Sequence, residues 1–128
     1  MNPGVFYFAP FLQPAVPVYQ LSRTIQNVPE LWREWASGFG NQPSVQSFES
    51  LYGAAWRPDA KDRVLFSRRK VIVDEIYARE ADGVSLETAV EEVELVRSRG
   101  KFSLYKLSQL LPTNRTKSIS GRIRLRTS

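Results

Sequence analysis

The sequence predicts an all-α protein: a small bundle of about five helices in the helix-turn-helix or Myb-like style, with an extended N-terminal arm and a basic C-terminal tail. Two observations predict this fold. Apolar residues recur at helical spacing in successive segments, and capping or turn residues separate those segments. The 128 residues include no cysteine, so we expect one core without disulfides. The chain divides into an arm at 1–27, a helical domain at 28–111 and a tail at 112–128.

The arm is apolar, carries a single charge at Arg23, and is interrupted by Pro3, Pro10, Pro14 and Pro17. Proline removes a backbone donor and disfavours helix at the preceding residue, so we expect extended chain and neither a membrane span nor a secretory signal. A segment this apolar either packs over the helical domain or docks onto a second copy of the chain or another protein. The sequence leaves both interpretations open.

Capping residues and glycines set the expected helix ends. Ser44, Asp59, Ser85 and Ser103 each precede a periodic apolar segment, as N-caps do. Gly53 stands where a left-handed C-cap is wanted. The expected helices cover 29–38, 45–52, 60–81, 86–98 and 103–111.

Charge is arranged in blocks along a chain of net charge +5 and pI of about 9.8. Residues 60–72 have five basic groups against one acid, residues 73–98 have eight acids against two arginines, and residues 99–128 have eight basic groups and no acid. A polyanion would therefore be bound at two basic zones and repelled between them.

The helix expected at 60–81 has two distinct faces. At about 100° per residue, Ile72 and Ile76 lie beside Leu65 in an apolar arc that we expect to face the core. Opposite Leu65 runs an outward stripe made of Arg63, Ser67, Lys70 and Asp74. Arginine and lysine contact guanine edges or phosphates and serine contacts phosphates, so this stripe suits a major groove; the alternative is a solvated basic face.

Paired arginines follow in the same helix. Arg68 lies at the flank of the stripe, whereas Arg69 lies close to the apolar arc, so we expect one of the two to be structural.

Trp32 and Trp35 are expected in the core. Trp56 is either a core residue or leans on a sugar–phosphate backbone while the adjacent Arg57 contacts phosphate.

Composition argues against an enzyme. With neither histidine nor cysteine, Ser-His triads, imidazole sites and thiolate metal sites are excluded. No glycine-rich phosphate loop occurs, and the acids of the third and fourth helices read as surface charges. We therefore expect no catalytic residue, no metal and no cofactor.

The ordered marks LWREW, LYG, WR and FSRRKVIVDEI, followed by SLYKLSQLL, resemble a fungal DNA-binding domain. That domain lies near the C-terminus of the yeast activator of glycolytic genes and is shared with osmotic-stress and invasive-growth activators and related mobile-element proteins. The resemblance covers residues 28–111. It implies a helical, sequence-specific binder of double-stranded DNA acting in the nucleus in transcription regulation, and it carries over Trp56, Arg57, Arg68, Arg69 and Lys70. The arm and the tail lie outside the pattern.

The expected DNA ligands are basic or hydroxyl side chains in the connector, the long helix and the C-terminal zone. They are Arg57, Lys61, Arg63, Ser67, Arg68, Arg69, Lys70, Lys101, Lys106, Arg115, Lys117, Arg122, Arg124 and Arg126. The alternative function is a protein-interaction or architectural module that uses the arm, connected with a mobile element or a kinetochore. Salt separates the two, because about five phosphate contacts give a log–log slope of about −4 to −5.

Overall fold

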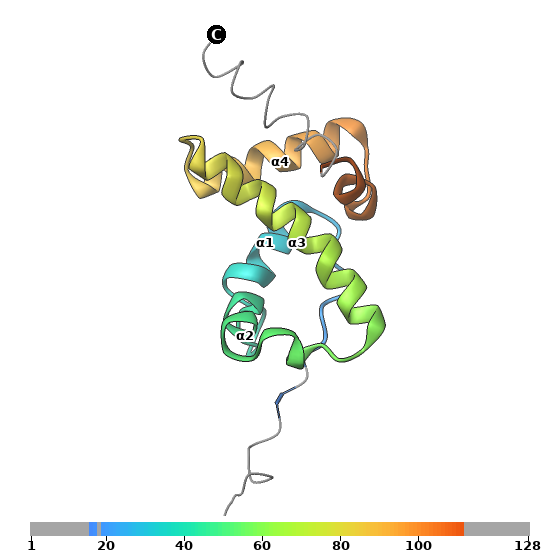
Figure 1. Cartoon of the computed structure of the whole chain (residues 1–128). Helices are drawn as coiled ribbons and strands as arrows, with labels where there is room; N and C mark the ends of the chain where they lie inside the picture. The colour runs from blue at the N-terminus through green and yellow to red at the C-terminus, as the bar shows by residue number, and fades with distance from the viewer. Residues whose placement is uncertain (1–15, 18, 112–128) are drawn as a thin grey trace, which may run out of the picture.

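The computed structural model describes residues 16–17 and 19–111. Within them lie α1 (Val28–Ala36), α2 (Val45–Tyr52), the 3-10 helix η2 (Gly53–Trp56), α3 (Ala60–Ala81) and α4 (Leu86–Gly100), followed by a closing helix at 104–111. No strand occurs among these residues, which confirms the all-helical bundle. Figure 1 shows α3 running diagonally across the molecule, with α1 behind its middle, α2 and η2 below it, and α4 and the closing helix above it.

Side-chain caps start the helices where the sequence predicts them. Ser44, Asp59 and Ser85 each accept a hydrogen bond from a backbone N–H of the first turn, at 3.1, 2.7 and 3.0 Å. Such caps satisfy donors that the helix itself cannot. The bounds of α2 and α3 are therefore those expected, whereas α1 ends at Ala36, two residues early.

α4 ends at Gly100, two residues later than the expected end at 98. The residue in the left-handed conformation is Lys101, with φ of 56°, and Gly100 is the last helical residue. A glycine at position 100 provides space, because a Cβ there would overlap the Phe102 ring. The glycine thus lets Phe102 fold back against the helix end.

The connector before α3 is a 3-10 helix that the sequence does not predict, and it inserts Trp56 into the core. Trp56 is fully buried, stacked on Phe48 at 5.8 Å and edge-on to Phe66 at 5.6 Å between ring centroids. Its Nε1 donates to Glu49 at 2.8 Å. The core interpretation of Trp56 is confirmed, and a role leaning on a sugar–phosphate backbone is wrong because no part of the side chain reaches solvent.

The segment before α1 is part of this core. Tyr19, Leu21 and Ile25 are buried, and the Tyr19 N–H donates to the Trp56 carbonyl at 3.4 Å. Residues 19–27 are therefore packed against the helices. Residues 1–15 and the tail at 112–128 lie outside the described residues, so the docking interpretation of the arm stays a prediction there.

Trp32 and Trp35 differ in depth. Trp35 is buried, and its Nε1 donates to the Tyr77 hydroxyl at 3.0 Å. Trp32 is half-buried, with its ring edge-on to that of Tyr77 at 5.4 Å. Both lie against the same α3 side chain, so the core placement is confirmed for Trp35 and holds in part for Trp32.

A buried carboxylate joins three elements. Glu34 of α1, 1% exposed, accepts from the Tyr19 hydroxyl at 3.1 Å, from the Ser22 N–H at 2.8 Å and from Arg69 Nη1 of α3 at 2.8 Å. Arg69 Nη2 also donates to the Ser22 carbonyl. Desolvation lowers the pKa of Arg69, although the negative charge of Glu34 acts in the opposite direction. Burial beside Glu34 raises the pKa of Tyr19. The carboxylate is thus fully partnered by the N-terminal segment and α3.

The expectation that the acids of the third and fourth helices are surface charges is wrong for two of them. Asp62 and Glu75 of α3 are buried, at 3% and 4% exposure. Asp62 pairs with Arg23 at 2.5 Å, and Glu75 pairs with Arg79 at 2.8 Å. A carboxylate can be buried where an arginine compensates its charge, and a helical wheel that counts only apolar residues does not register it.

We expect Arg69→Ala to lower the free energy of unfolding by about 3 to 5 kcal/mol, since it leaves a buried carboxylate without its cation. The matched control is Arg68→Ala, one position along. Arg68 is exposed and makes a cation–π contact with Tyr105, worth less than about 1 kcal/mol at a surface. Urea denaturation measures both, and equal losses would contradict the division of roles.

Glu94 holds α4 to the start of α1. Its Oε1 accepts from the Val28 N–H at 3.0 Å, and its carboxylate accepts from Arg97 Nε and Nη2 at 2.8 and 2.6 Å. The hydrogen bonds from Arg97 are the main cause that lowers the pKa of Glu94. The ionised carboxylate therefore stabilises the contact between α4 and α1.

A carboxyl group whose pKa is lower in the folded state adds stability above its unfolded pKa and loses it as the pH falls through the folded value. We expect Glu94→Gln to lower the free energy of unfolding at pH 7 by about 1 to 3 kcal/mol, the range for hydrogen bonds to a charged group. Denaturation between pH 7 and pH 3 should then show a shallower acid loss than the parent, whereas Glu91→Gln, at an exposed position of the same helix, should keep the parent's profile. An unchanged acid profile in Glu94→Gln would refute the assignment.

Candidate nucleic-acid interface

The first half of α3 turns one side to the core and the other to solvent. Its buried residues Asp62, Phe66 and Arg69 follow the spacing i, i+4 and i+7, which is one helix face. The position opposite that face is Val64, which is 49% exposed. We call the surface around it the Val64 face, which comprises the exposed residues Ala60, Lys61, Arg63, Val64, Ser67 and Arg68.

The predicted outward stripe overlaps the Val64 face only in part. Arg63 and Ser67 belong to the face, but Lys70 and Asp74 lie beyond it along α3 and pair with each other at 2.6 Å. The Lys70 ammonium also lies 5.8 Å from the centre of the Trp35 ring, so it leans toward α1.

The cations of the Val64 face have no carboxylate partner among the described residues. Arg63 donates to the Pro58 carbonyl, and the Arg68 guanidinium lies 4.3 Å from the centre of the Tyr105 ring on the closing helix. Lys61 is exposed. Their charges are therefore available to an anion, unlike that of Arg69, which is buried on the other side of the helix.

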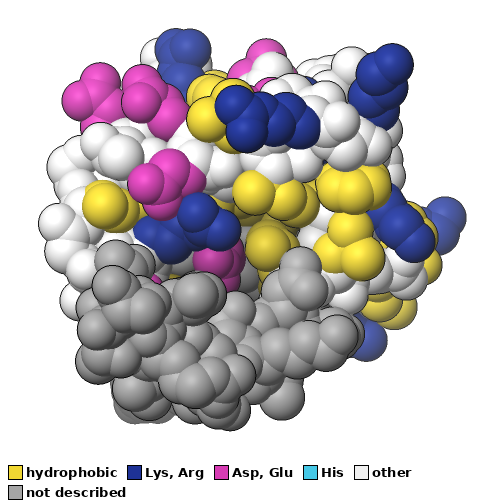
Figure 2. All heavy atoms as spheres, turned by 90° about the horizontal axis from the view of Figure 1, so that it is seen from above, with side chains coloured by type: hydrophobic (Ala, Val, Ile, Leu, Met, Phe, Trp, Pro, Cys, Tyr) yellow, Lys and Arg dark blue, Asp and Glu magenta, His cyan; other side chains and the backbone are white. Residues whose placement is uncertain are grey.

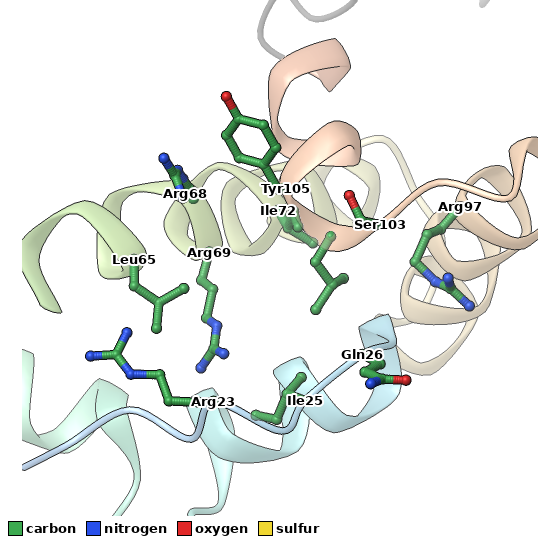
Figure 3. A pocket seen from close by; sticks show the side chains of 11 residues that line it. Arg23, Ile25, Gln26, Leu65, Arg68, Arg69, Ile72, Arg97, Ser103 and Tyr105 are labelled. Atoms are coloured by element: carbon green, nitrogen blue, oxygen red, sulfur yellow. The ribbon is translucent and has the colours of Figure 1, made fainter. Parts of the chain in front are cut away.

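A groove runs beside α3, between it, the N-terminal segment and the closing helix (Figure 3). Its volume is about 460 Å³, and a second hollow of about 450 Å³ continues it toward the start of α3. Arg23, Leu65 and Arg68 line both. Figure 3 shows Arg23 and Ile25 across the groove from α3, with Tyr105 and Ser103 at the closing helix. Arg23 is a basic residue at this site that the sequence analysis missed, because only the fold brings position 23 beside position 68.

Two predicted DNA ligands have their donors engaged inside the fold. Arg57 binds both oxygens of Glu49 at 3.0 and 3.1 Å, and its guanidinium lies 3.9 Å from the Phe66 ring centre. Its side chain is 12% exposed. Arg69 is held by Glu34 and the Ser22 carbonyl. Both arginines therefore tie α3 to the rest of the domain.

The remaining predicted ligands lie apart from α3 or outside the described residues. Lys101 and Lys106 are exposed, at the end of α4 and on the closing helix. The tail positions Arg115, Lys117, Arg122, Arg124 and Arg126 are not among the described residues, so their role stays a prediction.

Charge is unevenly distributed over the end of the molecule drawn in Figure 2. Acidic side chains gather on the left of that view, and the right carries basic and hydrophobic side chains. Among the described residues, Glu80, Glu87 and Glu91 are exposed where α3 turns into α4. A polyanion would be repelled from that end, which favours the opposite end of α3.

Other kinds of site find no support in the part of the chain that the structure describes. No helix there has the length and apolar character needed to cross a membrane. Nor do three or more acidic, histidine or cysteine side chains come together there in a way that could hold a metal ion. The exposed basic helix is the feature on which a function can be argued.

The fold and the site place this protein in the class of small helical domains with one exposed basic helix. A family model described as "Transcriptional activator of glycolytic enzymes" matches residues 19–97. The chain belongs to this family. The match begins at the buried Tyr19, so it includes the packed N-terminal segment, α1 to α3 and most of α4.

Curated relatives come from budding yeasts. The chain is 48% identical to Transcription factor-like protein EUC1 of Saccharomyces cerevisiae over 58 residues, 45% of this chain and 13% of that protein. It is 36% identical to Protein MSN1 of the same yeast over 76 residues, 59% of this chain and 20% of that protein. It is 31% identical to High-osmolarity-induced transcription protein 1 of Kluyveromyces lactis over 78 residues, 61% of this chain and 11% of that protein. The chain thus spans a small part of these relatives, and no solved structure gives a significant match.

We expect Arg57→Ala to lower the free energy of unfolding by about 1 to 3 kcal/mol, since it removes hydrogen bonds to the charged carboxylate of Glu49. Arg63→Ala is the control, because Arg63 is exposed and has no carboxylate partner among the described residues; it should change stability by less than about 0.5 kcal/mol. Thermal unfolding followed by circular dichroism measures both variants. If Arg57→Ala were as stable as the parent, its structural role would be refuted.

Proposed function

We propose that this chain is a DNA-binding module of a nuclear transcriptional regulator, and that the first half of α3 enters the major groove of double-stranded DNA through the Val64 face. The observation that carries the proposal is a basic, exposed helix face without an acidic side chain. Family membership supports it, as do the two relatives whose names refer to transcription. The proposal assigns the chain no catalytic role.

Electrostatics favour this part of α3 over the rest of the surface. Between Ala60 and Lys70 the single acid is Asp62, which is buried and paired with Arg23. Phosphates are attracted by cations that are free of partners, and each such contact releases counterions from DNA. A solvated basic face would have the same composition; the proposal is supported by three cations that lie together on one helix face without a carboxylate partner among the described residues.

The size and shape of α3 also fit the major groove of DNA. The 22 residues of α3 make a rod about 33 Å long and about 10 to 12 Å across, and the major groove is about 12 Å wide. Arg79 in the second half of α3 pairs with Glu92 of α4, whereas the residues of the Val64 face in the first half are exposed. Cations on both sides of the Val64 line can then reach phosphates of both strands.

The side chains of the face suit separate tasks. The guanidinium fork of Arg63 matches the two acceptors of guanine, whereas Lys61 suits a phosphate as a point charge. Arg68 lies at the rim of the groove with Arg23, where a phosphate of the same strand would meet both. We assign Lys101, Lys106 and the tail cations to phosphate contacts without sequence preference, and we assign Arg57 and Arg69 to support from within the fold.

The test begins with selection of bound duplexes from a random pool, which examines binding and specificity together. We expect Lys61→Ala with Arg68→Ala to weaken the selected duplex and a random one alike and to reduce the salt slope by about 2, one unit for each phosphate contact. We expect Arg63→Ala to cost about 1 to 3 kcal/mol and to relax specificity at one base pair. Lys70→Ala should have a smaller effect, because Lys70 is already paired with Asp74. Fluorescence anisotropy at several salt concentrations measures all of these.

Arg33→Ala serves as the control, since it removes one exposed cation from α1 and should leave binding unchanged. A folded Lys61→Ala, Arg68→Ala double variant that bound its selected duplex like the parent would remove this face from the interface. Failure of the parent to select any duplex, together with binding to a partner protein that does not respond to salt, would replace the proposal with the protein-interaction module.

A further inference from the structure

We propose that Val64 contacts the 5-methyl group of a thymine and so selects a T·A pair within the target site. The inference rests on the proposed function and adds one specificity-determining residue to it. Thymine offers this methyl group in the major groove, where it distinguishes T·A from the other base pairs.

The position of Val64 carries the inference. It lies opposite the buried face of α3, at the middle of the Val64 face, with Lys61 and Arg68 on one side and Arg63 on the other. A helix held by cations on both flanks brings its middle line closest to the base edges. Ala60 and Ser67 lie one turn before and after Val64, and their small side chains leave the close approach unobstructed.

The chemistry of Val64 is unlike that of its surroundings. It is a large apolar side chain left 49% exposed among charged residues. The other exposed large apolar side chains of the described residues lie off α3: Val16, Leu51, Leu95, Val96 and Tyr105. A valine in a helix holds one χ1 rotamer, so its methyl groups present a fixed surface, as recognition of one methyl group requires.

The experiment replaces each thymine of the selected duplex in turn by deoxyuridine, which removes the 5-methyl group and keeps base pairing. We expect the unmodified protein to lose about fourfold in affinity at one thymine, which corresponds to about 0.8 kcal/mol for one buried methyl-sized group. Val64→Ala should bind the unmodified duplex more weakly by a similar factor and should show no loss at that thymine. Other thymines should respond equally in both proteins.

Val96→Ala is the matched control, because Val96 is the same residue type at a 36% exposed position of α4. It should keep the parent's affinity and its sensitivity to deoxyuridine. A parent that selects a duplex but loses nothing at any deoxyuridine overturns the inference and leaves the proposed function standing, and so does a Val64→Ala variant with the parent's profile. A parent that binds no duplex overturns the proposed function and the inference with it. Because the first arm uses the unmodified protein, the result does not depend on the folding of a variant.

Discussion

The arrangement of this domain depends on the hydrogen bonds and the ion pair that the buried carboxylate of Glu34 makes. It lies in α1 and is hydrogen-bonded by Tyr19 and Ser22 of the N-terminal segment and by Arg69 of α3. A buried charge is tolerated only when its partners are in place, so the segment and α3 must dock together on α1. This pairing fixes the rotation of α3 about its axis, and the residue it directs outward is Val64.

The same helix therefore serves two purposes at its two ends. In the first half, the acid is neutralised from within by the pair of Asp62 with Arg23, which leaves the exposed face basic. In the second half, Arg79 bridges Glu75 to Glu92 of α4, and the helix is held in the bundle. A rigid base and a projecting basic end suit a helix that has to be placed in a groove.

Helix starts and the two faces of α3 could be predicted from the sequence, whereas the full width of its exposed side could not. The caps Ser44, Asp59 and Ser85 predicted helix starts because capping depends on neighbouring residues. The four residues of the predicted stripe are exposed or half-exposed. The stripe omits Lys61, Val64 and Arg68, which are exposed beside it, because it covers only the positions opposite Leu65. The place of Arg23 and the pairing of Arg57 with Glu49 depend on contacts between segments that only the fold brings together.

The most direct test of the account is a map of backbone amide chemical shifts by NMR while the selected duplex is titrated into the protein. The account predicts that the largest changes fall on residues 60–68 of α3, with smaller ones at Arg23 and Tyr105 beside the groove. The amides of Glu80, Glu87 and Glu91, at the acidic end, should stay unchanged. Changes concentrated on α2 or α4, with the first half of α3 unaffected, would contradict the claim that this helix is the DNA-binding element.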